Sequence, residues 1–270
     1  MLAQLLADAT LLSDRTQRHA QLQKIRDTIL KTPVEPSTLA PITTFVDSTY
    51  GTTTIRFRSS SNAEDLPGFN GAGLYTSTSV KLGDPAQSVD DGLRTVWSSL
   101  FRDRAFDERE LLRIDHTQVA MDVLVHPAFL SEKANGVIIT RDIQDILRGD
   151  IYTFNAQTGE ASVTNPAPGV ASDEFIYRLP PRLPPITERS RSSFTNGTSV
   201  MTEAEVVSAS CAAQALVSHF QPLLDPDGKN AYFTLDLEFK LIGPDRQLLF
   251  KQARPYAFGS WTDPGDCRQF

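Results

Sequence analysis

The chain has 270 residues, of which 40% are hydrophobic and 22% charged, and its formal net charge is −7 at pH 7. These values are ordinary for a globular protein, and the negative balance argues against general nucleic-acid binding but not against a nucleotide, which needs only a local basic patch. We expect a cytoplasmic protein, because no apolar run approaches the roughly 20 residues that cross a bilayer, the start lacks a basic signal-peptide segment, and two cysteines suggest no disulfide framework.

Residues 1–31 are predicted to be helical, with a break near Ser13 and Asp14, because apolar residues recur at helical spacing in the second part. The proline-containing segment Thr32–Pro36 should end this helical region. The first glycine of the chain is Gly51, so a glycine loop that cradles phosphate cannot lie before it.

Residues 52–59 alternate in polarity and are predicted to form a strand, with Arg56 and Arg58 on the face opposite the apolar side chains. A loop with hydroxyl side chains, an acidic pair and three glycines follows, up to Gly73. Guanidinium forks, together with backbone amides that a ligand can approach closely, are typical of phosphate binding. Taken alone, the strand is explained equally well by two solvated arginines at the surface.

The middle of the chain is predicted as a helix followed by strands. Ser88 and Asp91 form a capping pattern that begins a helix running to about Arg113. We interpret three of its charged side chains as a solvated helix face: Arg102, Arg104 and Arg109. Apolar, β-rich runs then predict successive antiparallel strands over residues 119–126, 136–143 and 151–155, with Gly136 opening the second.

Residues 165–200 are rich in Pro, Ser and Arg, so we expect irregular structure there, with a short strand over 174–179. Thr202 and Glu205 form a capping box for a helix that should end before Pro222. Two strands, over residues 233–242 and 247–256, are predicted to close the domain.

The final hairpin carries the sharpest candidate site. Asp236 and Glu238 face one way on its first strand, and Gln252 and Arg254 share a face of the second. A carboxylate and an amide oxygen on adjacent strands are hard ligands that suit Mg²⁺, and an arginine beside them would neutralise phosphate. From alternation alone, the solvated polar face of an edge hairpin is the commoner explanation.

A shared metal makes a geometric demand on this hairpin, since Glu238 and Gln252 must then be cross-strand neighbours on one side. A four-residue turn over 243–246 would instead place Glu238 opposite Lys251. We therefore predict a five-residue connection or a bulge.

Two motifs carry a family resemblance. The first is the segment Ile55–Tyr75, which reads IRFRSSSNAEDLPGFNGAGLY. The second is DLE at 236–238 followed by QARP at 252–255. Both resemble the nucleotide-binding domain of pyruvate phosphate dikinases, phosphoenolpyruvate synthases and glucan water dikinases. The resemblance implies an α/β fold of ATP-grasp type, with an antiparallel-rich sheet, flanking helices and an incomplete first lobe. It also implies a helical segment over 1–37, the nucleotide-binding domain over 38–257 and a tail over 258–270.

The resemblance implies a role for each matching residue. The metal would be held by Glu238 and Gln252, with Asp236 beside them, and the catalytic phosphate contacts would be Arg58 and Arg254. Further nucleotide contacts would come from Arg56, from the glycine loop at Gly71 and Gly73, and from the strand end at Val125 and His126. A structural role suits His126 equally well.

The implied ligands are ATP and Mg²⁺, and the implied function is phosphoryl transfer as the nucleotide-binding part of a phosphoenolpyruvate synthase-like or pyruvate phosphate dikinase-like enzyme. No phosphohistidine motif surrounds any of the four histidines, so we expect a separate phosphohistidine-domain and acceptor-binding protein, or domains outside this sequence. A glucan water dikinase-like enzyme and a non-catalytic nucleotide-binding module are the alternatives. A fragment, a subunit of a split enzyme and a degenerate relative all fit the sequence.

Overall fold

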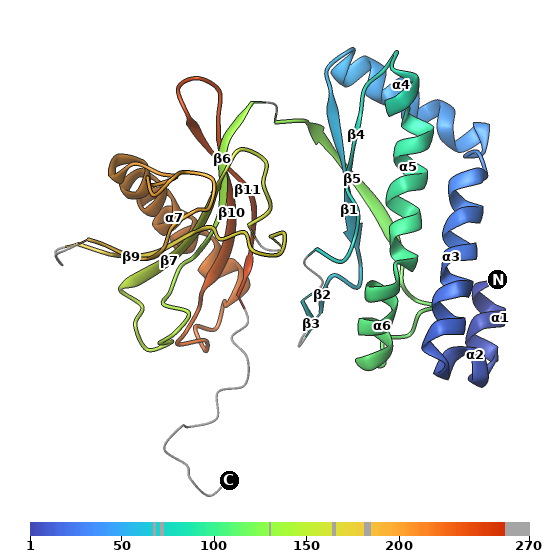
Figure 1. The fold of residues 1–270 in the computed structure, drawn as a ribbon, viewed down its shortest axis with the longest axis horizontal. Coiled ribbons are helices and arrows are strands. Elements are labelled where there is room, and N and C mark those ends of the chain that lie inside the picture. The colour runs from blue at the N-terminus through green and yellow to red at the C-terminus, as the bar shows by residue number, and fades with distance from the viewer. Residues whose placement is uncertain (67–68, 71–72, 130, 164–165, 181–184, 257–270) are drawn as a thin grey trace, which may run out of the picture. The chain divides into compact units, whose positions relative to one another are not determined.

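The computed structural model describes residues 1–270 except 67–68, 71–72, 130, 164–165, 181–184 and 257–270 (Figure 1). The chain forms two compact units, Met1–Ala128 and Phe129–Phe270. Helices flank antiparallel sheets, which confirms the mixed α/β class expected from the sequence. Among the described helices, none combines the length and the apolar character that crossing a membrane requires. The domain limits at residues 37 and 257 stay a prediction.

The N-terminal helical region consists of α1 (Leu2–Ala7), α2 (Ala9–Ser13) and α3 (Arg15–Lys31). The break expected near Asp14 is present, and a second one lies at Asp8. Each aspartate carboxylate accepts hydrogen bonds from two backbone N–H groups of the following turn, which caps the next helix.

The segment Thr32–Pro36 ends α3 as expected, but its last residue already begins α4 (Pro36–Tyr50), which was not predicted. Pro36 occupies the first helical turn, where the missing N–H costs nothing.

The predicted single helix over 88–113 is wrong in its length, because it divides into α5 (Val89–Ser98), the 3₁₀ turn η2 (Ser99–Phe101) and α6 (Asp103–Leu111). The Ser88 hydroxyl caps α5 by accepting from the Asp91 N–H at 3.1 Å. At the other end, the hydroxyls of Ser98 and Ser99 donate to the carbonyls three residues earlier, competing with the helical ladder.

The first unit contains a three-stranded sheet in the order β4-β1-β5, formed by β1 (Ile55–Ser61), β4 (Thr78–Val80) and β5 (Met121–Pro127). A two-stranded ladder, β2 (Asp65–Leu66) with β3 (Phe69–Asn70), and the turn η1 (Pro85–Gln87) lie between β1 and α5 in the chain. The expectation that β5 pairs with the next strand of the chain is wrong. It pairs with β1, since its valines pack into the same core as Ile55 and Phe57.

The second unit contains a six-stranded antiparallel sheet in the order β11-β10-β6-β7-β8-β9. Its strands are β6 (Glu132–Ile139), β7 (Ile151–Thr158), β8 (Asp173–Arg178), β9 (Ile186–Ser190), β10 (Leu235–Ile242) and β11 (Gln247–Pro255). The inward side chains of β10, β6, β7 and β8 form one core with helix α7 (Glu203–Leu224), which covers that face of the sheet (Figure 1).

The capping box predicted at Thr202 and Glu205 is present at the start of α7. The predicted end before Pro222 is wrong, because the helix continues to Leu224. Pro222 lies in the last turn, where its missing N–H breaks only one ladder bond, and the Asp225 N–H still donates to the Gln221 carbonyl at 2.8 Å.

Candidate functional site

The face of the six-stranded sheet opposite α7 carries the candidate site. Glu238 on β10 lies opposite Gln252 on β11 and opposite Val137 on β6, which in turn lies opposite Asn155 on β7. Residues opposite one another in a ladder project to the same side. Because Leu237 and Phe239 pack against α7, Glu238 and its row must project to the other side, which we call the polar face.

The predicted irregularity of the hairpin is confirmed as a bulge. Ile242 lies opposite Gln247 and Phe239 opposite Phe250, yet Glu238 lies opposite Gln252, so Lys251 is the extra residue. The bulge allows a four-residue turn over 243–246 and still keeps the carboxylate and the amide on one side.

Lys251 is a functional candidate that the sequence interpretation missed. Its Nζ lies 2.6 Å from Glu238 Oε2, and both side chains are about a quarter exposed, at 28% and 23%. The register mismatch that predicted the bulge could have revealed it, since an extra residue in a strand has to project somewhere.

One row further along the hairpin, Asp236 lies opposite Arg254. The Arg254 guanidinium donates from Nε at 2.9 Å and from Nη2 at 2.7 Å to Asp236 Oδ2. Asp236 is 7% exposed. Burial raises the pKa of the neighbouring Tyr256, and the charge of Asp236 raises this pKa further. The buried carboxylate therefore orients a guanidinium beside the Glu238–Gln252 row.

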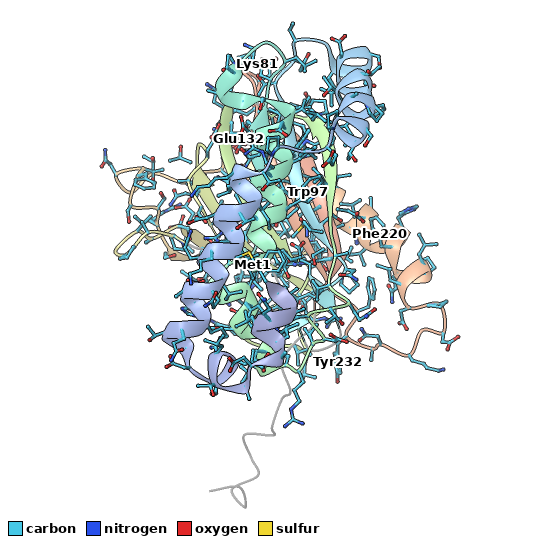
Figure 2. All side chains as sticks on the ribbon, turned by 90° about the vertical axis from the view of Figure 1, so that its right-hand side faces the viewer. Met1, Lys81, Trp97, Glu132, Phe220 and Tyr232 are labelled. Carbon is cyan, nitrogen blue, oxygen red and sulfur yellow. The ribbon has the colours of Figure 1, made fainter. Side chains whose placement is uncertain are left out.

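Two further polar side chains of this face matter for its chemistry. Lys240 forms an ion pair with Glu132, which Figure 2 labels, so this cation is already neutralised. Asn155 has its side-chain oxygen buried, and no described residue donates a hydrogen bond to it. A buried acceptor without a donor is costly, so Asn155 Oδ1 would gain from a ligand that donates.

The polar face fits Mg²⁺ as a site with two protein ligands, completed by water and ligand oxygens. Within the described ranges, no group of three or more His, Cys, Asp or Glu side chains is close enough to hold a metal. Glu238 and Gln252 could offer two hard oxygens, and the remaining positions would go to water or ligand oxygens. Mg²⁺ is usually held in this manner, through one or two protein oxygens, phosphates and water.

The other candidate residues belong to the first unit. Arg56 and Arg58 share a face of β1, as predicted, and Arg56 donates to the Ser77 carbonyl at 3.0 Å and to the Ser79 hydroxyl at 3.2 Å. On β5, the Val125 carbonyl accepts from the Tyr50 hydroxyl at 3.3 Å. His126 Nδ1 lies 2.7 Å from the Pro127 carbonyl.

The glycine loop is described only at its end, since Gly71 lies outside the described residues. Gly73 has φ +74°, a conformation that side chains disfavour, and a Cβ there would meet no atom within 4 Å. The next residues, Leu74 and Tyr75, are buried in a core with α6. The end of the loop is therefore fixed by these two buried side chains, which we call the loop anchor.

Arg109 contacts the loop anchor, so the interpretation of this side chain as solvated is wrong. Arg109 is 1% exposed and donates to the Tyr75 hydroxyl at 3.1 Å and the Leu100 carbonyl at 2.7 Å, with Nε lying 3.4 Å from His116 Nδ1. The charged neighbours in the sequence hid the inward position of this side chain. Arg102 and Arg104 are exposed, as expected.

The stability of the core around the loop anchor should decrease in acid, because His116 is buried beside Arg109. Burial lowers the pKa of His116, although a hydrogen bond with Glu110 opposes the shift. The unfolded chain, with a histidine pKa near 6.5, then takes up this proton first, so the free energy of unfolding should fall as the pH drops below that value. Urea denaturation at pH 7.5 and 5.5 should show a slope of at most about 1.4 kcal/mol per pH unit from this group.

The variant His116→Gln should lose this part of the pH dependence. Replacing the exposed His219 in the same way is the matched control and should leave it unchanged. Equal pH slopes in all three proteins would contradict the prediction.

A surface pocket of about 420 Å³ lies elsewhere, lined among others by Phe175, Met201 and Val206. These side chains belong to the core that the sheet shares with α7, so the pocket is on the side away from the polar face. It brings together no residue that the sequence had singled out.

Comparison with known proteins decides the family. The chain matches the family of the pyruvate phosphate dikinase AMP/ATP-binding domain over residues 2–262. It belongs to this family. The suspected relationship is thereby confirmed, and the family's name assigns it AMP or ATP as ligand.

Individual curated proteins are similar to the chain over shorter stretches. The chain is 32% identical to the phosphoenolpyruvate synthase of Aquifex aeolicus over 127 residues, 47% of this chain and 14% of that protein. It is 35% identical to the phosphoenolpyruvate synthase of Pyrococcus furiosus over 124 residues, 45% of this chain and 14% of that protein. A probable phosphoenolpyruvate synthase of Methanothermobacter thermautotrophicus is 40% identical over 86 residues, 32% of this chain and 12% of that protein. The matched part thus spans about one seventh of these relatives.

Proposed function

We propose that the chain binds Mg-ATP and serves as the ATP-grasp-type nucleotide-binding part of a phosphoenolpyruvate synthase-like or pyruvate phosphate dikinase-like phosphotransferase. The observation that carries this proposal is the bulged pairing of Glu238 with Gln252, which brings two hard oxygens to one side of the hairpin. Membership of an AMP/ATP-binding family supports the nucleotide.

In this proposal four residues of the polar face and their neighbour Asp236 have distinct tasks toward the metal, the phosphates and the rest of the nucleotide. Glu238 and Gln252 would hold the divalent cation, which when bound offsets negative charge on the phosphates. Asp236 holds the Arg254 guanidinium by two hydrogen bonds, so this fork would meet a phosphate oxygen without first losing much side-chain freedom. Asn155 Oδ1 would accept from a hydroxyl or amino group of the nucleotide.

Residues of the first unit complete the proposal. Arg58, with Arg56 beside it on β1, would bind phosphate, and the loop at Gly73 would allow a ligand close to its backbone. Val125 and His126 remain proposed adenine contacts. The histidine that carries the phosphoryl group and the final acceptor would come from a separate protein or domain.

The proposal is tested by titrating the 270-residue chain with the non-hydrolysable analogue Mg-AMP-PNP in a calorimeter. Binding is expected in the wild type, and Glu238→Ala should weaken it by about ten-fold or more, corresponding to ~1.4 kcal/mol for a lost charged ligand. The exposed Asp245 in the turn of the same hairpin offers the matched control, and Asp245→Ala should bind normally. Absent binding in the wild type, or equal binding by Glu238→Ala, would refute the proposal.

A further inference from the structure

The bulge gives the polar face a feature that a regular hairpin would lack. Phe250 lies opposite Phe239 and projects toward α7, while Gln252 lies opposite Glu238 and projects to the polar face. The single residue between them, Lys251, joins the polar face, because its ammonium lies 2.6 Å from Glu238 Oε2. The ammonium thus lies at the carboxylate oxygen to which a divalent cation on Glu238 would bind.

The Lys251 ammonium and a divalent metal ion compete for the Glu238 carboxylate. A divalent ion bound to this carboxylate would repel an ammonium a few ångströms away, so binding of the metal requires Lys251 to move. Lys251 has a flexible four-carbon stem and a side chain that is 28% exposed, so it can move without disturbing the core. The phosphates of a nucleotide bound to the same metal would then offer the ammonium a new anionic partner.

We propose that Lys251 couples metal binding to nucleotide binding: its ammonium neutralises Glu238 in the ligand-free chain and transfers to a phosphate oxygen when the cation takes that carboxylate. This inference rests on the proposed function and adds a regulatory consequence to it. The lysine opposes the bare metal and favours the metal–nucleotide complex, so the site discriminates between the two.

The variant Lys251→Met keeps an unbranched side chain of nearly the same length and removes the charge, and it should shift two affinities in opposite directions. Mn²⁺ alone, titrated by calorimetry or by the electron paramagnetic resonance signal of the free ion, should bind about five-fold more tightly than to the wild type. Mg-AMP-PNP should bind about five-fold more weakly, because one phosphate contact is lost. A merely structural role would move both affinities in the same direction.

Two variants guard against a misleading result from Lys251→Met. Deletion of Lys251 leaves Phe250 opposite Phe239 and Gln252 opposite Glu238 in a ladder without an extra residue, so it should reproduce the opposite shifts. The exposed Lys229, paired with Asp227 outside this hairpin, supplies the matched charge control, and Lys229→Met should change neither affinity.

The outcomes separate this inference from the proposed function. If the wild type binds Mg-AMP-PNP through Glu238 but Lys251→Met shifts both affinities in one direction or neither, the coupling role is refuted and the proposed function stands. If the wild type binds neither ligand, both are refuted. Opposite shifts in Lys251→Met and in the deletion, with Lys229→Met unchanged, would establish the coupling.

Discussion

Replacing Gly136 by alanine should lower the free energy of unfolding by about 3 kcal/mol, because overpacking a closed core typically costs 1–3 kcal/mol and this contact includes backbone. A Cβ at this position would lie 2.5 Å from two ring atoms of Phe239 and 2.6 Å from the Asn155 carbonyl oxygen. Phe239 has no exposed surface, so its ring cannot turn aside into solvent. Urea denaturation followed by circular dichroism measures the loss.

The same substitution should also weaken nucleotide binding, since Gly136 lies opposite Phe239, the residue after Glu238. The double variant Gly136→Ala with Phe239→Leu should recover part of the stability, because leucine lacks the two ring atoms that clash, whereas the Asn155 carbonyl remains in place. A single variant Gly136→Ala as stable as the wild type would show that the strands separate easily at this point.

Gly136 also illustrates how far the sequence could predict the fold. An apolar, β-rich run predicted a strand over residues 136–143, with the glycine at its start, whereas β6 spans Glu132–Ile139, so that half of the predicted range lies outside it. A glycine in an apolar run marks either a boundary or a close approach, and only the partner strand decides which. Phe239, distant in the sequence, is the partner that decides it here.

Long-range partners also explain the other wrong predictions. The pairing of β5 with β1 could not be predicted, because it depends on which core its valines join. β9 was missed because Ile-Thr-Glu-Arg-Ser lacks apolar alternation, as an edge strand can. Arg109 was assigned to solvent because its neutral partners, a tyrosine hydroxyl and a carbonyl, leave no charge pattern in the sequence.

The hairpin site was more predictable because its constraints are local. Strand alternation, the length of the turn and the demand that Glu238 face Gln252 together required an irregularity, and the bulge confirms it. The ion pair of Lys251 with Glu238 follows from the same bulge, yet alternation by itself assigns an extra residue to neither face.

Replacing Asp173 by alanine should lower the free energy of unfolding by about 2–5 kcal/mol, the cost of leaving two buried N–H groups without an acceptor. Asp173 has no exposed surface, and its carboxylate accepts from the Ser192 N–H at 2.7 Å and the Val200 N–H at 2.6 Å. It therefore fixes an irregular segment that has no sheet ladder of its own and that leads directly into Thr202, the cap of α7.

The adjacent Glu174 provides the matched control for Asp173, because it projects to the opposite side of β8. Its carboxylate pairs with Arg189 at 3.2 Å and is one third exposed, so Glu174→Ala should cost no more than about 1 kcal/mol. Asp173→Asn should fall between the two, since the amide keeps one acceptor oxygen but loses the second. If Asp173→Ala unfolded at the same urea concentration as Glu174→Ala, water rather than the carboxylate would have to satisfy both N–H groups. The segment between β9 and α7, which was predicted as irregular from its composition, would then be held by solvent and not by this side chain.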